Sequence, residues 1–316
     1  MKIRLGYVAI SNTVNNTTSK TITYTNFKKD KDINNIYNLI DSNLDALEEI
    51  LTYNIKNNIH FYRLTSKLIP LATHKDVEFD YITPFKNKFN YLGKIIKDNN
   101  LRIDLHPDQF AVLNSVNKEV VKNTIDILNY HYKILDALNI KDKVIILHIG
   151  SNNFGKEKSI TRFINTFNKL PEYLKNCIVI ENDDKIFNIK DTLYISKKLN
   201  IPMVLDYHHY LCNNDNEIIE DYIKEIFNTW HKKTPKIHFS SPKSALKKEY
   251  RSHHDYINLS TFIDFIEKIK FINKDFDIMI EAKAKDDALF RLVRGLKYKT
   301  SYTFIDDTSF IVDNLN

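Results

Sequence analysis

Residues 144–148 of the chain read VIILH, residues 178–181 read IVIE and residues 203–206 read MVLD. Each run is short, apolar and rich in branched side chains, which is typical of a strand buried in a parallel sheet. Longer segments with helical spacing lie between them, such as the apolar stripe within residues 160–174. Because the same alternation continues in both directions, the sequence predicts βα units around a parallel sheet.

The pattern predicts eight strands. They are expected at residues 3–8, 61–64, 101–105, 144–148, 178–181, 203–206, 236–239 and 278–281. A predicted helix follows each one, and no linker rich in Pro, Gly or Ser divides the series. These features fit a single α/β domain, a (β/α)8 TIM barrel over residues 1–300, with its active site at the carboxyl ends of the strands. Residues 301–316 would form a tail packed on the barrel or trailing from it, and a doubly wound sheet is the alternative fold.

Composition narrows the function classes. The 316 residues include 46 Lys and Arg against 40 Asp and Glu, a net charge of +6 that allows a nucleic-acid partner without requiring one. Cys177 and Cys212 are far apart, which argues against disulfides or a cysteine zinc site and indicates reduced thiols in a cytoplasm. No apolar run approaches the roughly 18 residues of a membrane span, so no membrane partner is expected.

Only five glycines occur, which argues against glycine-rich phosphate loops. Residues 150–156 read GSNNFGK and resemble a Walker A loop, but Glu157 stands where that motif needs a Ser or Thr hydroxyl. We therefore expect no nucleotide cofactor.

Imidazole and carboxylate side chains close most of the predicted strands. They are His106, His148, Glu181, Asp206, His238 and Glu281. In a barrel these strand ends converge on one rim, where charged groups would repel one another or be desolvated unless a cation joined them. Imidazole and carboxylate are ligands for divalent zinc, manganese or iron, so the pattern predicts a site for several metal ions. His209 lies three residues after Asp206 and can turn toward a neighbouring ion.

A series of motifs runs in order across nearly the whole chain: LGY, PLATH, HPDQF, LHIGS, IEND, LDYHH, KIHFS, HHDYI and IEAKAKDDAL. In this order they resemble the UV damage endonuclease family, a barrel related to endonuclease IV. The resemblance implies a cluster of roughly two or three divalent ions, usually Mn²⁺. It also implies cleavage of the DNA backbone immediately 5′ to UV photoproducts, with abasic sites as a further candidate substrate, leaving a 3′ hydroxyl.

The metal ligands implied by the resemblance are His74, His106, His148, Glu181, Asp206, His209, His238, His253 and Glu281. His74 and His253 rest on the resemblance alone, and His254 is the alternative to His253. Glu181 is the candidate to bridge two ions, and the catalytic group is Glu181, Glu281, His106 and Lys236.

Lys236 precedes His238 by two residues on a short strand, so both side chains should point into the barrel. An ammonium group beside divalent cations is unfavourable. We expect either a neutral or hydrogen-bonded amine or a carbamate, unless Lys236 begins the strand too low to reach the site.

In the family a Gln followed by a Tyr probes the lesion. Here the pair reads Gln109 and Phe110, which keeps the ring and loses the hydroxyl. Tyr7 is the matching aromatic, with Asn12 or Ser11 as its polar partner. The candidate phosphate contacts near the strand ends are Lys243, Lys247, Lys248, Arg251, Lys283 and Lys285.

The expected partner is damaged double-stranded DNA, bound by a monomer. One alternative is a metal-dependent sugar isomerase or epimerase on the same barrel, which would need neither a DNA-probing loop nor a basic rim. A second is a non-enzymatic DNA-binding protein, which would have no reason to gather carboxylates where phosphate must approach.

Overall fold

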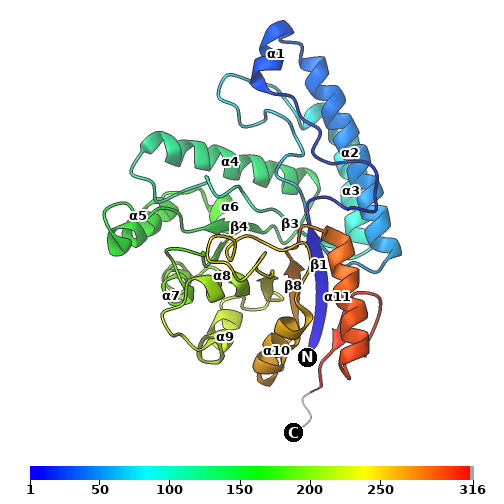
Figure 1. Cartoon of the computed structure of the whole chain (residues 1–316). Coiled ribbons are helices and arrows are strands. Elements are labelled where there is room, and N and C mark those ends of the chain that lie inside the picture. The colour runs from blue at the N-terminus through cyan, green and yellow to red at the C-terminus, as the bar shows by residue number, and fades with distance from the viewer. Residues whose placement is uncertain (314–316) are drawn as a thin grey trace.

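Parallel strands form the centre of the molecule in the computed structural model, which describes residues 1–313 (Figure 1). They are β1 (Lys2–Val8), β2 (Phe61–Arg63), β3 (Arg102–Asp104), β4 (Ile145–His148), β5 (Ile178–Glu181), β6 (Met203–Asp206), β7 (Lys236–Phe239) and β8 (Phe276–Ile280). Hydrogen bonds join them in the order β3-β2-β1-β8-β7-β6-β5-β4, and a bridge between Leu105 and Ile145 connects the two outer strands. The sheet is therefore a nearly closed barrel, which confirms the predicted (β/α)8 fold against the doubly wound alternative.

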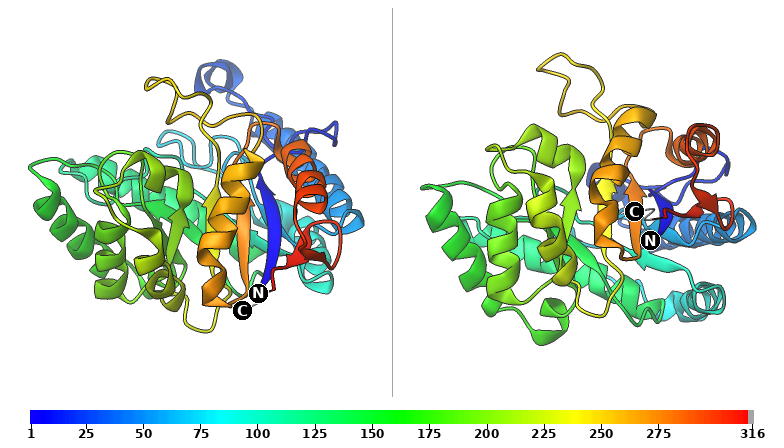
Figure 2. Two further views of the ribbon diagram at one scale, coloured as in Figure 1. Left: turned by 60° about the horizontal axis from the view of Figure 1, so that its bottom comes forward. Right: turned by 90° about the horizontal axis from the view of Figure 1, so that it is seen from below.

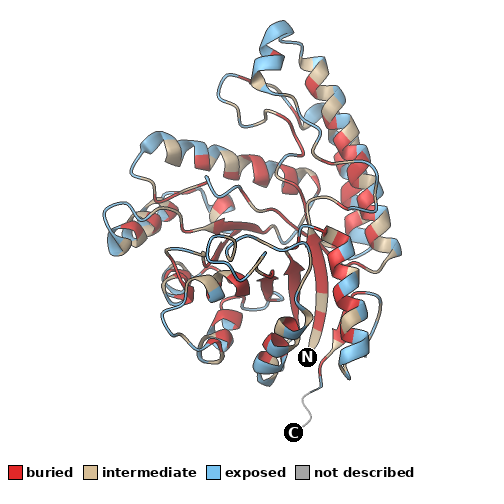
Figure 3. Ribbon diagram, viewed as in Figure 1, coloured by how far each residue is buried: buried red, intermediate tan, exposed pale blue. Residues whose placement is uncertain are grey.

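Helices surround the barrel and follow each strand. The longer ones are α2 (Ile33–Lys56), α3 (Lys86–Asp98), α4 (Lys118–Ala137), α5 (Lys156–Asn168), α7 (Ile189–Leu199), α9 (Ile219–Asn228), α10 (Leu259–Ile269) and α11 (Lys285–Lys299). The shorter ones are α1 (Tyr24–Asp30), α6 (Glu172–Lys175), α8 (Tyr207–Cys212) and the 3₁₀ turns η1 (Thr83–Phe85) and η2 (Lys270–Ile272). Their apolar faces are buried against the strands and their polar faces are exposed (Figure 3). Within residues 1–313 no helix is both long and apolar enough to cross a bilayer.

The chain after α11 returns to the amino end of β1. It forms β9 (Thr303–Phe304) and β10 (Ser309–Ile311), and β10 pairs antiparallel with β1 from Lys2 to Arg4 (Figure 2). β2 reaches β1 only at Tyr7 and Val8, so β10 occupies the part of that edge that β2 does not reach. Of the expected tail, residues 314–316 lie outside the described residues.

A buried carboxylate ties the amino ends of three strands together. Asp277 on β8 is fully buried, lies 2.6 Å and 2.8 Å from the Nε and Nη2 of Arg4, and accepts from Arg102 Nη1 at 2.6 Å. Burial alone would raise the pKa of Asp277, but the two guanidinium groups hold it below its ordinary value. β8 begins two residues before the predicted strand, because a charged residue at its second position interrupts the apolar pattern from which the strand was predicted.

We expect Asp277→Asn to lower the free energy of unfolding by about 3 kcal/mol, since both guanidinium groups would lose their buried counter-charge. Urea unfolding followed by circular dichroism measures the change. The matched control is Asp98→Asn, which removes an exposed pair with Lys94 and should change stability by less than about 0.5 kcal/mol. Similar values for the two variants would contradict the assigned role of Asp277.

Candidate metal centre

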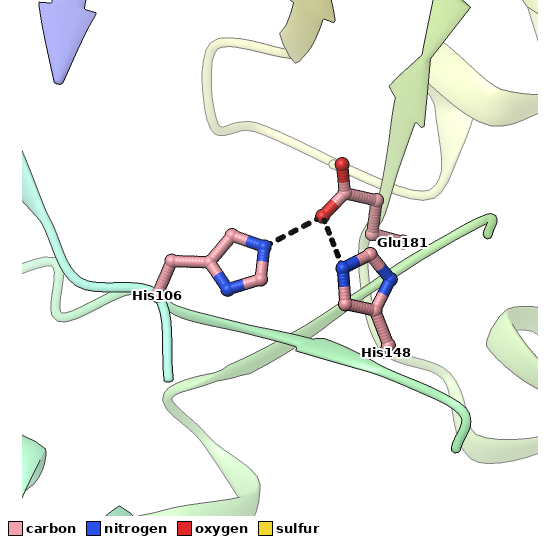
Figure 4. A group of neighbouring side chains, drawn as sticks. All are labelled: His106, His148 and Glu181. Atoms are coloured by element: carbon pink, nitrogen blue, oxygen red, sulfur yellow. Dashed lines mark hydrogen bonds and ion pairs between the residues drawn. The ribbon is translucent and has the colours of Figure 1, made fainter. Parts of the chain in front are cut away.

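Glu181, the last residue of β5, lies at the centre of the rim and is fully buried. Its Oε2 lies 2.8 Å from His106 Nε2 and 3.7 Å from His148 Nε2, so both imidazoles point at one oxygen (Figure 4). The other oxygen, Oε1, lies 2.6 Å from His238 Nδ1 and 3.9 Å from His209 Nδ1. One carboxylate is thus shared among four imidazoles that come from different parts of the chain.

The surroundings of Glu181 keep it ionised. Burial alone would raise its pKa, but the imidazoles of His238 and His148 hold it well below the ordinary value. Asp206 shows the opposite balance, because burial raises the pKa of its carboxyl well above the ordinary value despite the nearby His209. Burial also lowers the pKa of His148 to about 4.

Strand register brings the site together. His148 is directly opposite Glu181 in the β4–β5 pair, and Asp206 is opposite His238 in the β6–β7 pair. Asp206 also caps α8, since its Oδ1 accepts from the backbone N–H of His209 at 2.8 Å. This capping bond turns the first residues of α8 back over the rim and places the His209 ring beside Glu181.

The nitrogen and oxygen donors form three adjoining groups. Within each group the ligand atoms lie within 4.8 Å of one another. The groups are His106, His148 and Glu181; Glu181, Asp206 and His209; and Asp206, His238 and Glu281. Two buried atoms of this cluster, His148 Nδ1 and Asp206 Oδ2, have no hydrogen-bond partner among the described residues. Buried polar atoms are normally paired, and nitrogen and oxygen donors suit divalent zinc, manganese or iron, so these residues fit such ions.

Two ligands implied only by the resemblance lie outside the three groups. His253 is next to the cluster, with its ring centroid 6.5 Å from that of His209. Its neighbour His254 is exposed and accepts from the Tyr256 backbone N–H, so His253 is the one that faces the cluster. His74 stacks on Tyr24 of α1 at 4.0 Å. The ligand roles of His74 and His253 stay predictions.

Arg63, at the end of β2, was missed by the sequence reasoning. Its side chain is buried and donates to Glu281 Oε1 at 2.6 Å, to His238 Nε2 at 2.6 Å and to Asp104 Oδ1 at 3.2 Å. Guanidinium groups only donate, so His238 Nε2 keeps its lone pair and its Nδ1 carries the proton directed at Glu181. Burial alone would raise the pKa of Glu281, but Arg63 holds it below the ordinary value. The sequence feature that could have identified Arg63 is its position at the end of a strand, which it shares with histidines and acids of the rim.

Lys236 lies in the barrel interior, below the cluster. It is fully buried and forms an ion pair with Asp104, which also accepts from Arg63. Burial lowers the pKa of Lys236 to about 7. Lys236 is therefore linked to Glu281 and His238 through Asp104 and Arg63.

The two aromatic residues predicted to contact DNA, Phe110 and Tyr7, differ in exposure. Phe110 is 74% exposed, and Gln109 beside it is also exposed, in the loop after β3. Tyr7 is fully buried, and its hydroxyl donates to Asn54 Oδ1 on α2 at 2.8 Å. A fully buried side chain cannot stack on a base. Tyr7 is therefore a core residue, and the expected contact between Tyr7 and DNA is wrong. Asn12 is exposed, and its backbone N–H donates to Asp286 at 2.6 Å.

The predicted basic contacts lie in the loops after β7 and β8. The loop after β7 stands away from the barrel and carries Lys243, which pairs with Glu249 at 2.9 Å, and Arg251, which lies 3.6 Å from Asp184 (Figure 2). Lys283 is exposed. Lys285 begins α11 and is partly buried, which lowers its pKa.

Comparison with known proteins finds relatives over nearly the whole chain. The model of the family described as UV-endonuclease UvdE matches residues 3–309. A UV DNA damage endonuclease of Bacillus cereus (strain B4264) is 43% identical over 94% of this chain and 97% of its own length. One from Bacillus anthracis is 42% identical over 96% of this chain and 99% of its own. The crystal structure of SacUVDE superposes with a TM-score of 0.86 at 35% identity, covering 94% of this chain and 98% of that one.

More distant structures share the fold alone. Endonuclease IV from Thermus thermophilus gives a TM-score of 0.57 at 12% identity, with 93% of this chain and 99% of that one covered. An L-ribulose 3-epimerase gives 0.52 at 14%, covering 83% and 84%.

Barrel, rim and relatives together define a DNA repair endonuclease, an enzyme of the hydrolase class. The chain belongs to the UvdE family of UV endonucleases, as the motifs of the sequence indicated.

We expect Arg63→Ala to lower the free energy of unfolding in chelator by about 3 kcal/mol, because Asp104 and Glu281 would lose a buried counter-charge. Added Mn²⁺ should raise the melting temperature of this variant more than that of the wild type, since a bound cation replaces part of the lost charge. Differential scanning calorimetry with and without metal measures both. Lys175→Ala, which breaks a surface pair with Glu172, is the control, and equal responses would contradict the prediction.

Proposed function

We propose that the chain hydrolyses the DNA backbone immediately 5′ to UV photoproducts, and also at abasic sites, leaving a 3′ hydroxyl. The activity would depend on several divalent ions, with Mn²⁺ the ion that we favour. The observation that carries the proposal is the Glu181 carboxylate, which is shared among four imidazoles and adjoins Asp206 in a buried rim. Such a donor set has little purpose in a protein that only binds DNA, because its carboxylates would repel phosphate.

The residues that would hold the ions are His74, His106, His148, Glu181, Asp206, His209, His238, His253 and Glu281. When bound, clustered divalent ions polarise the phosphate, activate water and stabilise the leaving oxygen. Glu181 would bridge neighbouring ions, because its two oxygens face different imidazoles. Arg63 would fix the orientation of Glu281 through their ion pair.

For Lys236 the ion pair with Asp104 favours the hydrogen-bonded amine. A carbamate would place a second negative charge against the same carboxylate, so it is the less favoured form.

The proposed partner is damaged double-stranded DNA, bound by a single copy of the chain in the cytoplasm. Lys243, Arg251 and Lys283 lie in loops that leave the carboxyl ends of the last two strands, Lys285 begins α11 after the second of these loops, and all four would contact phosphates. Gln109 and the exposed ring of Phe110 would probe the opened lesion. The sugar epimerase alternative is supported by a likeness of fold alone.

The direct test is nicking of supercoiled plasmid, irradiated against unirradiated, with Mn²⁺ and with chelator. We expect nicking only of irradiated plasmid and only with metal. Glu181→Gln should lower the rate at least about a hundredfold, because a neutral amide cannot bridge two cations. Circular dichroism should show a folded variant, and Glu172→Gln, at an exposed position of α6, should nick normally. A normal rate for folded Glu181→Gln would remove Glu181 from the proposed role.

Replacing Gln109 and Phe110 together by Ala should reduce the preference for damaged over intact duplex about tenfold, since stacking on an opened base would be lost. Competitive binding of the two duplexes by fluorescence anisotropy measures the preference. The shift of melting temperature on adding Mn²⁺ should stay unchanged in this variant. Full discrimination by the double variant would exclude the pair as the probe.

A further inference from the structure

Phe154 has an unusual combination of exposure and backbone conformation. It lies in the loop between β4 and α5, shortly after His148, and is 75% exposed. Its φ is 65°, in the left-handed region that residues other than glycine rarely adopt. An apolar ring is therefore held in solvent on a strained backbone. It lies in the GSNNFGK segment, for which the sequence predicts no nucleotide binding.

Hydrogen bonds hold this strained loop in place. Arg162 on α5 donates from Nη2 to the carbonyl of Asn153 at 2.6 Å, and the N–H of Gly155 donates to Asn152 at 3.2 Å. The residues on either side of Phe154 are thus fixed. Its exposure is a defined feature of the fold, since the surrounding bonds determine the backbone conformation.

The same loop is joined to the loop that carries Phe110. Asn114, fully buried in the β3–α4 loop, accepts from the Ser151 N–H and donates to the Ser151 carbonyl, each at 2.8 Å. At Gly150, whose φ is 110°, an added Cβ would lie 2.7 Å from Asn114 Oδ1, so only glycine allows this approach. Arg162 Nε also donates to the Asn114 carbonyl at 2.9 Å. The two loops, each with an exposed Phe, are therefore bonded into one unit at the carboxyl ends of β3 and β4, beside His106 and His148.

We infer that Phe154 stacks on a nucleobase exposed where the duplex opens at a lesion, as a second aromatic contact beside Phe110. This inference rests on the proposed function and names a further residue that determines its specificity. A damaged pair is easier to open than an intact one, and any base offers a π face to an exposed ring. Exposed rings on two joined loops provide two such surfaces at a fixed relative position.

The test measures binding of a duplex with one photoproduct, and of the same duplex undamaged, by fluorescence anisotropy in chelator, where incision does not interfere. Phe154→Ala should weaken binding to the damaged duplex about five- to a hundredfold and affect the undamaged duplex less. Phe154→Tyr, which keeps a ring, should restore most of the affinity. The matched control is Phe271→Ala at η2, another exposed Phe, placed before β8 at the opposite end of the barrel.

Phe154→Gly separates the ring from the backbone. Glycine accepts a positive φ, so this variant should melt no lower than the wild type and still lose affinity for damaged DNA as Phe154→Ala does. The inference is overturned if Phe154→Ala binds damaged duplex like Phe271→Ala, or if both duplexes lose affinity equally. If either result is found while the wild type still nicks irradiated plasmid selectively, the proposed function stands and only the role of Phe154 is excluded. A wild type with no preference for damaged DNA overturns both.

Discussion

Two buried carboxylates, Glu181 and Asp206, meet the partly buried Glu281 at one rim, and the rest of the structure depends on this constraint. Glu181, Asp206 and Glu281 converge within a few ångströms, and buried charge is tolerated only where opposite charge or ligands compensate it. Arg63 and the surrounding imidazoles supply this compensation among the described residues. Two groups of ion pairs also lie in the barrel, one of Asp104 with Arg63 and Lys236 and a separate one of Asp277 with Arg4 and Arg102 nearer the amino ends of the strands.

The sequence was most informative where apolar runs ended in a single polar residue. β5, β6 and β7 have the predicted bounds, because nothing charged interrupts β5 or β6 and His238 fits the inward period of β7. The sequence alone could not show which charged residues are buried, because their counter-ions are distant along the chain. Arg63, Asp104 and Asp277 look like solvent-facing charges until the fold brings their counter-ions together with them. Tyr7 shows the converse error. A strand-end aromatic suggested the rim, but its hydroxyl turns outward to Asn54 on α2.

The division between barrel and loops explains how one fold serves different chemistries. Epimerases share the barrel at a TM-score near 0.52, so the barrel itself does not choose the substrate. In this chain the loops after β3 and β4 add exposed rings, and the loop after β7 adds cations. The strands and the residues directly after them position the imidazoles and carboxylates, whereas the loops form the surface around them.

The pairing of β10 with β1 has a consequence for the order of events during synthesis. Lys2 is opposite Ile311, so β1 is made long before the segment that covers this edge. β1 must also wait for β8, which closes the barrel beside it. Contacts so remote in sequence form slowly, and the nascent chain exposes unpaired edges of β1 until β8 and β10 have been made.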